Sequence, residues 1–228
     1  MSKQDVWVVI PAYNESEVIA SVLSNLQSFD TSYKIVVVDD CSTDDTVAFA
    51  KKFNIYVLKH PINLGQGAAL ATGIQYALSK NAEIIITFDA DGQMYPEDIK
   101  KLVTKLQNSN YDVVLGSRFL EEKPQGITKS KALTLKLAVL FSKMTTGLRI
   151  TDTHNGLRAF TADASRKITI SQNRMAHASE ILTEISRAKL NYCEVPVTIK
   201  YTDYSKNKGQ SIFNSLNILY ELFVRENK

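Results

Sequence analysis

The first 115 residues alternate short apolar runs with longer amphipathic segments, and this alternation limits the possible folds more than any other feature. The apolar runs predict strands over residues 6–10, 34–38, 55–58, 83–88 and 111–115. The segments between them have apolar residues at helical spacing and predict helices over 16–27, 42–52, 68–78 and 96–107. Short strands separated by helices form right-handed βαβ units. We therefore expect an α/β fold with a mainly parallel sheet flanked by helices.

The second half of the chain is less regular. We expect amphipathic helices over residues 131–146, 178–188 and 211–224, and strands over 156–160 and 191–201. In the first half, Ser42 or Thr43 is the expected N-cap of the helix over 42–52. No linker or internal repeat is evident, so we expect residues 1–228 to form one domain, with 1–118 and 119–228 as its two halves.

Polar residues directly follow three of the predicted strands. They are Pro11-Ala12-Tyr13-Asn14-Glu15 after the first, Asp39-Asp40 after the second and Asp89-Ala90-Asp91 after the fourth. Parallel strands have their carboxyl ends at one edge of the sheet, where the ligands of such folds bind. The sequence therefore predicts a functional site built from these three segments.

The pair Asp89-x-Asp91 is a candidate metal site. Mg²⁺ prefers carboxylate oxygens, and it commonly bridges one or two carboxylates to substrate phosphates. A turn at Asp91-Gly92 lets both carboxylates converge, and Gln93 adds a neutral oxygen nearby. The pattern favours a Mg²⁺ or Mn²⁺ site on a diphosphate. The alternative is that these residues only cap a loop.

A glycine-containing loop, Asn63-Leu64-Gly65-Gln66-Gly67-Ala68-Ala69, leads into the helix predicted over 68–78. Gly65 and Gly67 allow close backbone approach, and a helix N-terminus offers free N–H groups to an anion. This loop is not the dinucleotide fingerprint of dehydrogenases, which should follow the first strand. It is a weak signal by itself for a phosphate site.

The net charge of +3 conceals an asymmetry between the two halves. Residues 1–114 contain 9 Lys and Arg against 14 Asp and Glu, whereas residues 115–228 contain 18 against 10. This distribution indicates an acidic metal site beside a basic surface for an anionic partner, unless the charges are only solvated. Two cysteines exclude a disulfide scaffold and favour a reducing compartment. Few aromatic residues lie among the basic ones, so we expect no nucleic-acid partner.

Five motifs together resemble the family-two inverting glycosyltransferases of the GT-A fold, which is Rossmann-like. They are residues 9–15, 37–44, 63–69, 89–93 and Gly116-Ser117-Arg118. Within that family the chain is similar to the dolichol- and polyprenyl-phosphate hexose synthases. That closer likeness rests on Gly116-Ser117-Arg118, on the segment Asp152 to Phe160 and on Lys208-Gly209-Gln210-Ser211.

The resemblance implies a role for each candidate residue. Pro11, Tyr13, Glu15, Asp39 and Asp40 would bind the nucleoside of a UDP-sugar, beside Gly65 and Gly67. Asp89, Asp91 and Gln93 would hold the metal on the diphosphate. Arg118 would meet the acceptor phosphate. The basic charge of the second half adds Arg158 and Lys208 as further candidates, and Asp152 either orients the acceptor or accepts a proton, unless it is only a turn residue. Gln66 departs from the basic residue of many relatives.

The implied reaction is inverting transfer of a hexose, Glc or GlcNAc, to polyprenyl phosphate for cell-surface glycan synthesis. A phosphate acceptor is already nucleophilic, so no strong general base is needed. Transfer to a glycan hydroxyl is the first alternative, and it needs a base such as Asp152 or Glu180. An inactive nucleotide-sugar-binding module is the second, although both metal-site carboxylates are present.

The amphipathic helices bear on location. The segments 131–146 and 211–224 either pack on the core or lie against a membrane or a membrane partner. No apolar run approaches the roughly 20 residues that span a bilayer, and the N-terminus has no signal-peptide pattern. Some compact relatives work with a small separate membrane protein. We therefore expect a cytoplasmic protein, peripheral on the cytoplasmic membrane face, with such a protein as a possible partner.

Overall fold

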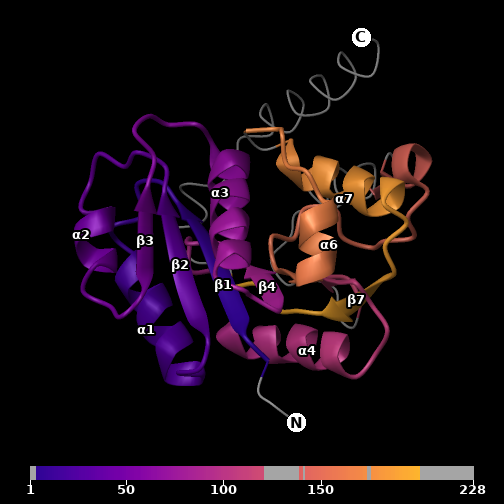
Figure 1. Ribbon diagram of the computed structural model, residues 1–228, viewed down its shortest axis with the longest axis horizontal. Helices are drawn as coiled ribbons and strands as arrows, with labels where there is room; N and C mark the ends of the chain where they lie inside the picture. The colour runs from indigo at the N-terminus through magenta and orange to yellow at the C-terminus, as the bar shows by residue number, and fades with distance from the viewer. Residues whose placement is uncertain (1–3, 121–138, 141, 174–175, 201–228) are drawn as a thin grey trace.

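The computed structural model describes residues 4–120, 139–140, 142–173 and 176–200. Its centre is a seven-stranded sheet in the order β3-β2-β1-β4-β6-β5-β7 (Figure 1). The strands are β1 (Val6–Ala12), β2 (Lys34–Asp39), β3 (Tyr56–Lys59), β4 (Ile84–Thr87), β5 (Val113–Ser117), β6 (Arg158–Thr161) and β7 (Tyr192–Pro196). The helices are α1 (Ile19–Phe29), α2 (Thr46–Ala50), α3 (Gln66–Ser79), α4 (Pro96–Gln107), α6 (Ala162–Lys167) and α7 (His177–Arg187).

The sheet is mainly parallel, as the sequence predicted. All its neighbouring strands run parallel except β6, which is antiparallel to both β4 and β5. Strand β6 comes from the second half of the chain, and it separates β4 from β5. The strand pairing therefore places the segment just before Arg158 between two carboxyl ends of the parallel strands.

Helices cover both faces of the sheet, because the strands are apolar on both sides. Alternate residues of β1 face opposite ways: Val8 and Ile10 join the core with α1 and α4, whereas Trp7 and Val9 pack toward α3. A third cluster joins β5 and β6 to α6 and α7. In Figure 1, α3, α6 and α7 accordingly lie on one face of the sheet, and α1 and α4 on the other. Each fully buried Ile or Leu in these clusters contributes roughly 1.5–3 kcal/mol.

One predicted helix of the first half is much shorter in the structure. The helix expected over 42–52 is only α2, Thr46–Ala50, because Ser42 and Thr43 bind Asn14 instead. Ser42 Oγ accepts a hydrogen bond from Asn14 N (2.9 Å), and Thr43 N donates to Asn14 Oδ1 (2.9 Å). Neither Ser42 nor Thr43 is therefore the N-cap, which is Asp45.

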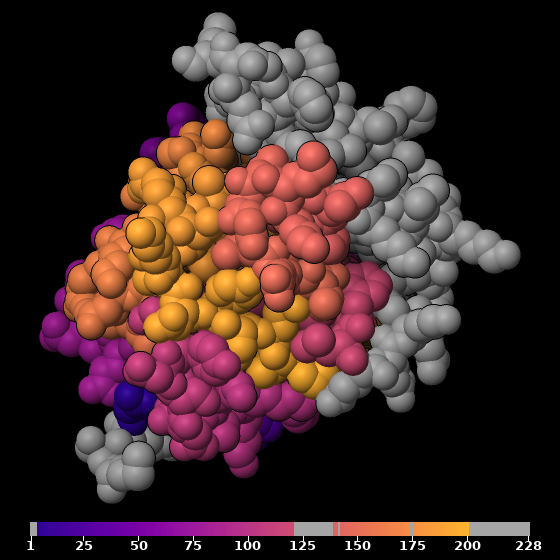
Figure 2. All heavy atoms as spheres, turned by 90° about the vertical axis from the view of Figure 1, so that its right-hand side faces the viewer, coloured from indigo at the N-terminus to yellow at the C-terminus, as the bar shows by residue number. Residues whose placement is uncertain are grey.

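The described part of the segment predicted as a helix over 131–146 is helical, at 139–140 and 142–146. Its Leu140 and Met144 are 54% and 78% exposed, so these side chains face away from the core. The helix predicted over 211–224 lies outside the described residues. None of the described helices has the length and hydropathy required to span a lipid bilayer. In Figure 2 the described residues after 139, in salmon to yellow, cover one face above α4.

Candidate active site at the carboxyl edge of the sheet

The structure brings together the three polar segments that the sequence singled out. Ala12 lies opposite Asp39 in the β1–β2 register, and Asp40 N donates to Ala12 O (2.8 Å). Phe88 N donates to Val9 O (3.0 Å), which places the end of β4 beside β1. One edge of the sheet therefore carries the residues after β1, β2 and β4.

Asp89 lies at the centre of this edge, and its carboxylate is held from two sides. Gln66, the first residue of α3, donates from Nε2 to Asp89 Oδ1 (3.1 Å). Gly156 packs directly against the carboxylate: a Cβ at position 156 would lie 2.8 Å from Asp89 Oδ1 and closer still to Oδ2. Glycine at position 156 is therefore required for Asp89 to keep this position.

The backbone turns after Asp89, as expected for a convergent pair. Gly92 has a φ of +72°, in the left-handed region that favours glycine. Asp91 Oδ1 accepts a hydrogen bond from Gln93 N (3.0 Å). Asp91, Gly92 and Gln93 are all half-buried, so this turn remains partly accessible from outside.

The electrostatics of Asp89 fit a bound cation. Burial raises the pKa of Asp89 to about 7, and the negative charges of Asp91 and Glu15 add to the effect, while Arg158 and Arg118 oppose it. A carboxylate whose ionised form is disfavoured in this way is stabilised by a nearby positive charge. A divalent cation between Asp89 and Asp91 would supply that charge.

The donor set suits a cation that keeps other ligands. Within the described residues, no group of three or more His, Cys, Asp or Glu side chains is arranged to hold a metal. An all-protein cage is therefore absent from that part of the chain. Two carboxylates are enough for Mg²⁺ or Mn²⁺ when substrate phosphates and water complete the coordination, so the residues present fit such an ion.

The residues after β1 and β2 form a partly open end of the same edge. Tyr13 is 44% exposed, and Glu15 is half-buried. Asp39 is buried; its Oδ2 accepts from Ser42 N (3.1 Å), whereas its Oδ1 has no hydrogen-bond partner among the residues that the structure describes. A buried carboxylate oxygen without a partner is costly unless a ligand donates to it. Asp39 Oδ1 thus offers an acceptor to a bound molecule next to Pro11.

Asp40 uses its carboxylate to hold the glycine-containing loop. Its Oδ1 accepts from Leu64 N (2.9 Å) and bonds His60 Nδ1 (2.8 Å), and its Oδ2 accepts from Gly65 N (2.6 Å). Gly65 has a φ of +101°. The structure therefore gives Asp40 a part in shaping the loop, a contact that the sequence pattern did not indicate.

The N-terminus of α3 is not open to an anion in the way the sequence suggested. Gly67 N donates to Asn173 O (2.9 Å), and a Cβ at Gly67 would collide with Gln172 O. The segment 172–173 therefore packs over the first turn of the helix. Gly67 is needed for this close approach, and its N–H is already used within the protein.

Arg118 lies at the end of β5 and is anchored by Asp152. Its Nε donates to Asp152 Oδ2 (2.6 Å), and its Nη2 donates to Asp152 Oδ1 (2.7 Å). The Arg118 backbone N–H also donates to Asp152 Oδ2 (3.1 Å). A bidentate pair of this kind fixes the plane of the guanidinium. Arg118 is close enough to Asp89 to lower its pKa.

Asp152 is poorly suited to accept a proton. Burial alone would raise its pKa, but the hydrogen bonds and the charge of Arg118 outweigh burial and hold the pKa below its ordinary value. The side chain is fully buried. The structure therefore argues against Asp152 as a general base and places it as the partner that orients Arg118.

Arg158 is inside the protein rather than on a basic surface. It is 4% exposed, and its Nε and Nη2 donate to the main-chain oxygens of Asn155 (3.1 Å) and Thr153 (3.4 Å). Burial lowers its pKa to about 10, against the opposing effect of Asp89 and Asp152. The structure places Arg158 as a buried cation near two carboxylates of the site, Asp89 and Asp152, and a direct phosphate contact stays a prediction.

The remaining sequence candidates are easily placed. Glu180 accepts from Ser171 N (3.0 Å) and Gln172 N (2.8 Å), so its carboxylate holds a loop, and no base role follows from its position. Lys208, the other basic candidate, lies outside the described residues.

Sequence reasoning missed three residues of the site. Gln66 and Gly156 contact Asp89, and Glu194 on β7 accepts from Thr151 N (2.8 Å) beside Asp152. The one sequence signal for Glu194 is a carboxylate among the apolar and aromatic residues 192–197. Gln66 and Gly156 lie in segments that the sequence analysis singled out, but nothing there indicates their contacts with Asp89, which join segments 23 and more residues apart.

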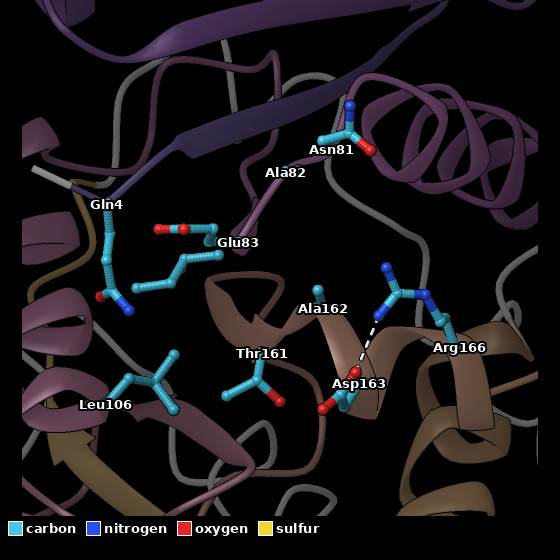
Figure 3. Close-up of a pocket in the computed structure, with 10 residues that line it drawn as sticks. Gln4, Asn81, Ala82, Glu83, Leu106, Thr161, Ala162, Asp163 and Arg166 are labelled. Atoms are coloured by element: carbon cyan, nitrogen blue, oxygen red, sulfur yellow. Dashed lines mark hydrogen bonds and ion pairs between the residues drawn. The ribbon is translucent and has the colours of Figure 1, made fainter. Parts of the chain in front are cut away.

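A pocket of about 390 Å³ lies at the opposite edge of the sheet (Figure 3). Gln4 precedes β1 and Glu83 precedes β4, so the pocket is at the amino ends of the parallel strands. The Arg166–Asp163 ion pair drawn there (2.7 Å) is exposed. None of the candidate active-site residues lines this pocket, which is therefore separate from the candidate active site.

Comparison with known families and proteins agrees with this geometry. Residues 7–169 match the family model described as glycosyl transferase family 2. The chain belongs to this glycosyltransferase family. Its mixed sheet matches solved structures of the GT-A fold, among them glucosyl-3-phosphoglycerate synthase from Mycobacterium tuberculosis in complex with Mn²⁺ and UDP-glucose. That structure has a TM-score of 0.74 at 17% identity, with 98% of this chain and 79% of that chain covered.

Curated relatives of this glycosyltransferase include enzymes named for lipid phosphates. The UDP-N-acetylglucosamine–dolichyl-phosphate N-acetylglucosaminyltransferase of Methanococcus voltae is 33% identical, with 98% of this chain and 97% of the relative covered. The undecaprenyl-phosphate mannosyltransferase of Micrococcus luteus is 27% identical, with 92% and 91% covered. An uncharacterized protein of Methanocaldococcus jannaschii, MJ1222, is 36% identical over 99% of this chain and 94% of its own.

Proposed function

We propose that this glycosyltransferase moves a hexose, Glc or GlcNAc, from a UDP-sugar to a polyprenyl phosphate such as undecaprenyl phosphate, with inversion. One observation carries the proposal: the acidic pair Asp89 and Asp91 shares an edge of the sheet with Arg118, which Asp152 holds in a bidentate pair. The edge thus combines groups for a metal diphosphate with a positioned cation for a phosphate acceptor.

Asp89 and Asp91 hold the divalent ion in this proposal, with Gln93 beside them. When bound, Mg²⁺ or Mn²⁺ supplies Lewis-acid stabilisation of the charge on the leaving diphosphate. The protein residues keep the two carboxylates at fixed positions: Gln66 donates to Asp89, and Gln93 N donates to Asp91. The donor complexes of the solved structures with Mn²⁺ and UDP-glucose support this assignment.

The nucleoside occupies the end of the edge formed by β1 and β2. Asp39 Oδ1, which has no partner among the described residues, accepts a hydrogen bond from the base or the ribose. The exposed Tyr13 side chain lies against the nucleoside, beside Pro11 and Glu15. Asp40 and Gly65 keep the neighbouring loop in place.

The acceptor phosphate binds at Arg118, with Lys208 as a further cation. Gly67 and Arg158 act through the packing around the site.

No general base is required for this reaction. A phosphate oxygen attacks the anomeric carbon without first losing a proton at neutral pH, so the protein must mainly position and neutralise it. The lowered pKa of Asp152 agrees with that requirement. Transfer to a sugar hydroxyl would need a base, which the described residues around Arg118 do not offer in an accessible form.

The relatives' acceptors support a lipid phosphate, and hence a step in cell-surface glycan synthesis. The enzymes of Methanococcus voltae and Micrococcus luteus are named for dolichyl and undecaprenyl phosphate. We propose that the chain works at the cytoplasmic face of the membrane, with the exposed Leu140 and Met144 on the side of the lipid and a small membrane protein as partner.

The test is a panel of nucleotide-sugars offered to the purified protein with Mn²⁺ and either undecaprenyl phosphate or an oligosaccharide. The proposal predicts a lipid-linked hexose from UDP-glucose or UDP-N-acetylglucosamine, and no extended oligosaccharide. Extension of the oligosaccharide would support the hydroxyl acceptor instead. Binding of UDP-sugar without transfer to any acceptor would support an inactive binding module.

A further inference from the structure

Glu194 is a carboxylate without a matching cation, on the strand next to β5. In the β5–β7 register it lies opposite Leu115, three residues before Arg118. Its side chain is half-buried, and among the described residues no Lys or Arg forms an ion pair with it. Burial raises its pKa, and the nearby charge of Asp152 adds to that effect. The ionised side chain therefore costs stability, so its presence calls for an explanation.

The Glu194 carboxylate binds one short segment of the chain. Its Oε1 and Oε2 accept from Thr151 N (2.8 and 2.9 Å) and from Thr151 Oγ1 (3.1 Å), and Oε1 accepts from Asp152 N (3.2 Å). All of these groups donate. Only an ionised carboxylate offers acceptors alone, whereas an amide or a protonated acid would present hydrogens to some of them.

The segment held by Glu194 is the one that anchors Arg118. Asp152, whose backbone Glu194 binds, makes the bidentate pair with the Arg118 guanidinium. Thr151 Oγ1 also lies 2.6 Å from Ser117 Oγ, which ties the same segment to the end of β5. A continuous set of hydrogen bonds therefore runs from Glu194 through Thr151 and Asp152 to Arg118.

We propose that Glu194 is a positioning residue for Arg118: its carboxylate fixes Thr151 and Asp152 so that the guanidinium is presented to the acceptor phosphate in one orientation. The inference rests on the proposed function, in which Arg118 meets that phosphate. Glu194 itself touches neither substrate. Its removal should therefore impair use of the acceptor and leave the donor site, at Asp39 and Asp89, unchanged.

The test compares Glu194→Gln with wild type for the KM of undecaprenyl phosphate, the KM of the UDP-sugar and kcat. We expect the acceptor KM to rise about tenfold, with the donor KM unchanged. In an Arg118→Ala background, Glu194→Gln should cause no further rise, since the two residues act as one unit. An equal rise in the acceptor KM in both backgrounds, or an unchanged acceptor KM, would overturn the proposal.

Glu184→Gln is the matched control, because Glu184 binds Thr169 N and Arg187 instead.

Two further measurements test the proposal if the Glu194→Gln variant does not fold or shows no turnover. Should Glu194→Gln not fold, Thr151→Val removes the hydroxyl that donates to the Glu194 carboxylate and also contacts Ser117 Oγ, and it should raise the acceptor KM about threefold; no change overturns the proposal. Nitrogen-15 NMR of the Arg118 Nε–H, which Asp152 holds, needs no turnover. Faster exchange of that proton in Glu194→Gln than in wild type is expected, and equal exchange overturns it. Absence of lipid transfer by wild type would refute only the proposed function.

Discussion

At the scale of single residues, the aspartates of this site differ by what surrounds them. Asp152 faces Arg118 and has a lowered pKa, whereas Asp89 faces Asp91 and Glu15 and has a raised one. The carboxylate oxygens of Asp40 accept hydrogen bonds from the backbone N–H groups of Leu64 and Gly65. The same side chain therefore serves as an anchor for an arginine, a candidate metal ligand and a brace for a loop.

The raised pKa of Asp89 predicts pH-dependent metal binding. Below about pH 7 Asp89 is protonated in the metal-free protein, so a proton competes with the cation for the same carboxylate. Mn²⁺ affinity, measured by titration calorimetry, should fall by up to about tenfold per unit as the pH drops through this range. A constant affinity from about pH 8 to pH 6 would contradict the raised pKa. Asp98→Asn, a carboxylate on α4, is a control that should keep the wild-type dependence.

The bidentate pair predicts that lysine cannot replace Arg118. Arg118→Lys keeps the positive charge but loses the planar fork that Asp152 holds from two sides. We expect kcat/KM for the lipid phosphate to fall about 10- to 100-fold, with UDP affinity within about twofold of wild type. Full acceptor use by the lysine variant would show that charge alone suffices. Exposed Lys143 offers a control, since Lys143→Arg should change neither value.

The sequence predicted which residue types gather at the site, but it did not predict their division of roles. Asp89 and Asp91 stood out because they follow a buried strand. Nothing in the local sequence shows that Arg118 pairs with Asp152, 34 positions away, or that Asn173 covers the N–H of Gly67. These contacts depend on tertiary packing, which the sequence pattern does not contain.

At the scale of elements, α3 lies close to the sheet because a glycine faces it. Gly73 is buried in the middle of the helix, and a Cβ there would collide with Val9 Cγ1 of β1 and lie 3.2 Å from Val38 Cγ2 of β2. This close approach sets the position of the helix whose first residue, Gln66, binds Asp89. Helix packing and the geometry of the candidate metal site are thus connected through α3.

The packing of α3 predicts the effect of Gly73→Ala. Alanine favours the helix over glycine by about 1 kcal/mol, but overpacking against β1 costs about 1–3 kcal/mol. The difference of the two effects is a fall of up to about 2 kcal/mol in the free energy of unfolding, measured in urea. Gln75→Ala, at an exposed position of the same helix, should leave it unchanged or slightly raised. A stabilised Gly73→Ala variant would contradict the close packing.

The element order was largely predictable, because apolar periodicity marks buried strands and helix faces. The predicted strands and helices of the first half are all present, although α2 is shorter than expected. The insertion of antiparallel β6 between β4 and β5 was not predictable. It pairs segments about 70 positions apart, Ile84 with Thr161 and Thr87 with Arg158, and no local signal encodes such a pairing.

At the scale of the whole molecule, the acidic first half and the more basic second half meet at one edge of the sheet. Strand β2 ends at Asp39, Asp89 and Asp91 follow β4, and Arg118 follows β5. Strand β6, between β4 and β5, places Arg158 beneath them as a buried cation. The charge asymmetry of the sequence thus corresponds to neighbouring parts of one edge. In the proposed function, the donor diphosphate binds on the acidic side and the acceptor phosphate binds at Arg118.

The central claim is that a divalent ion held by Asp89 and Asp91 binds the diphosphate of the donor. The most direct measurement is calorimetric titration of UDP into wild type and into an Asp89→Ala/Asp91→Ala variant, each with Mn²⁺ and with EDTA. The account predicts that Mn²⁺ strengthens UDP binding to wild type at least about tenfold and has no effect on the variant. Equal UDP affinity of wild type in Mn²⁺ and in EDTA, or an equal gain in the variant, would contradict it.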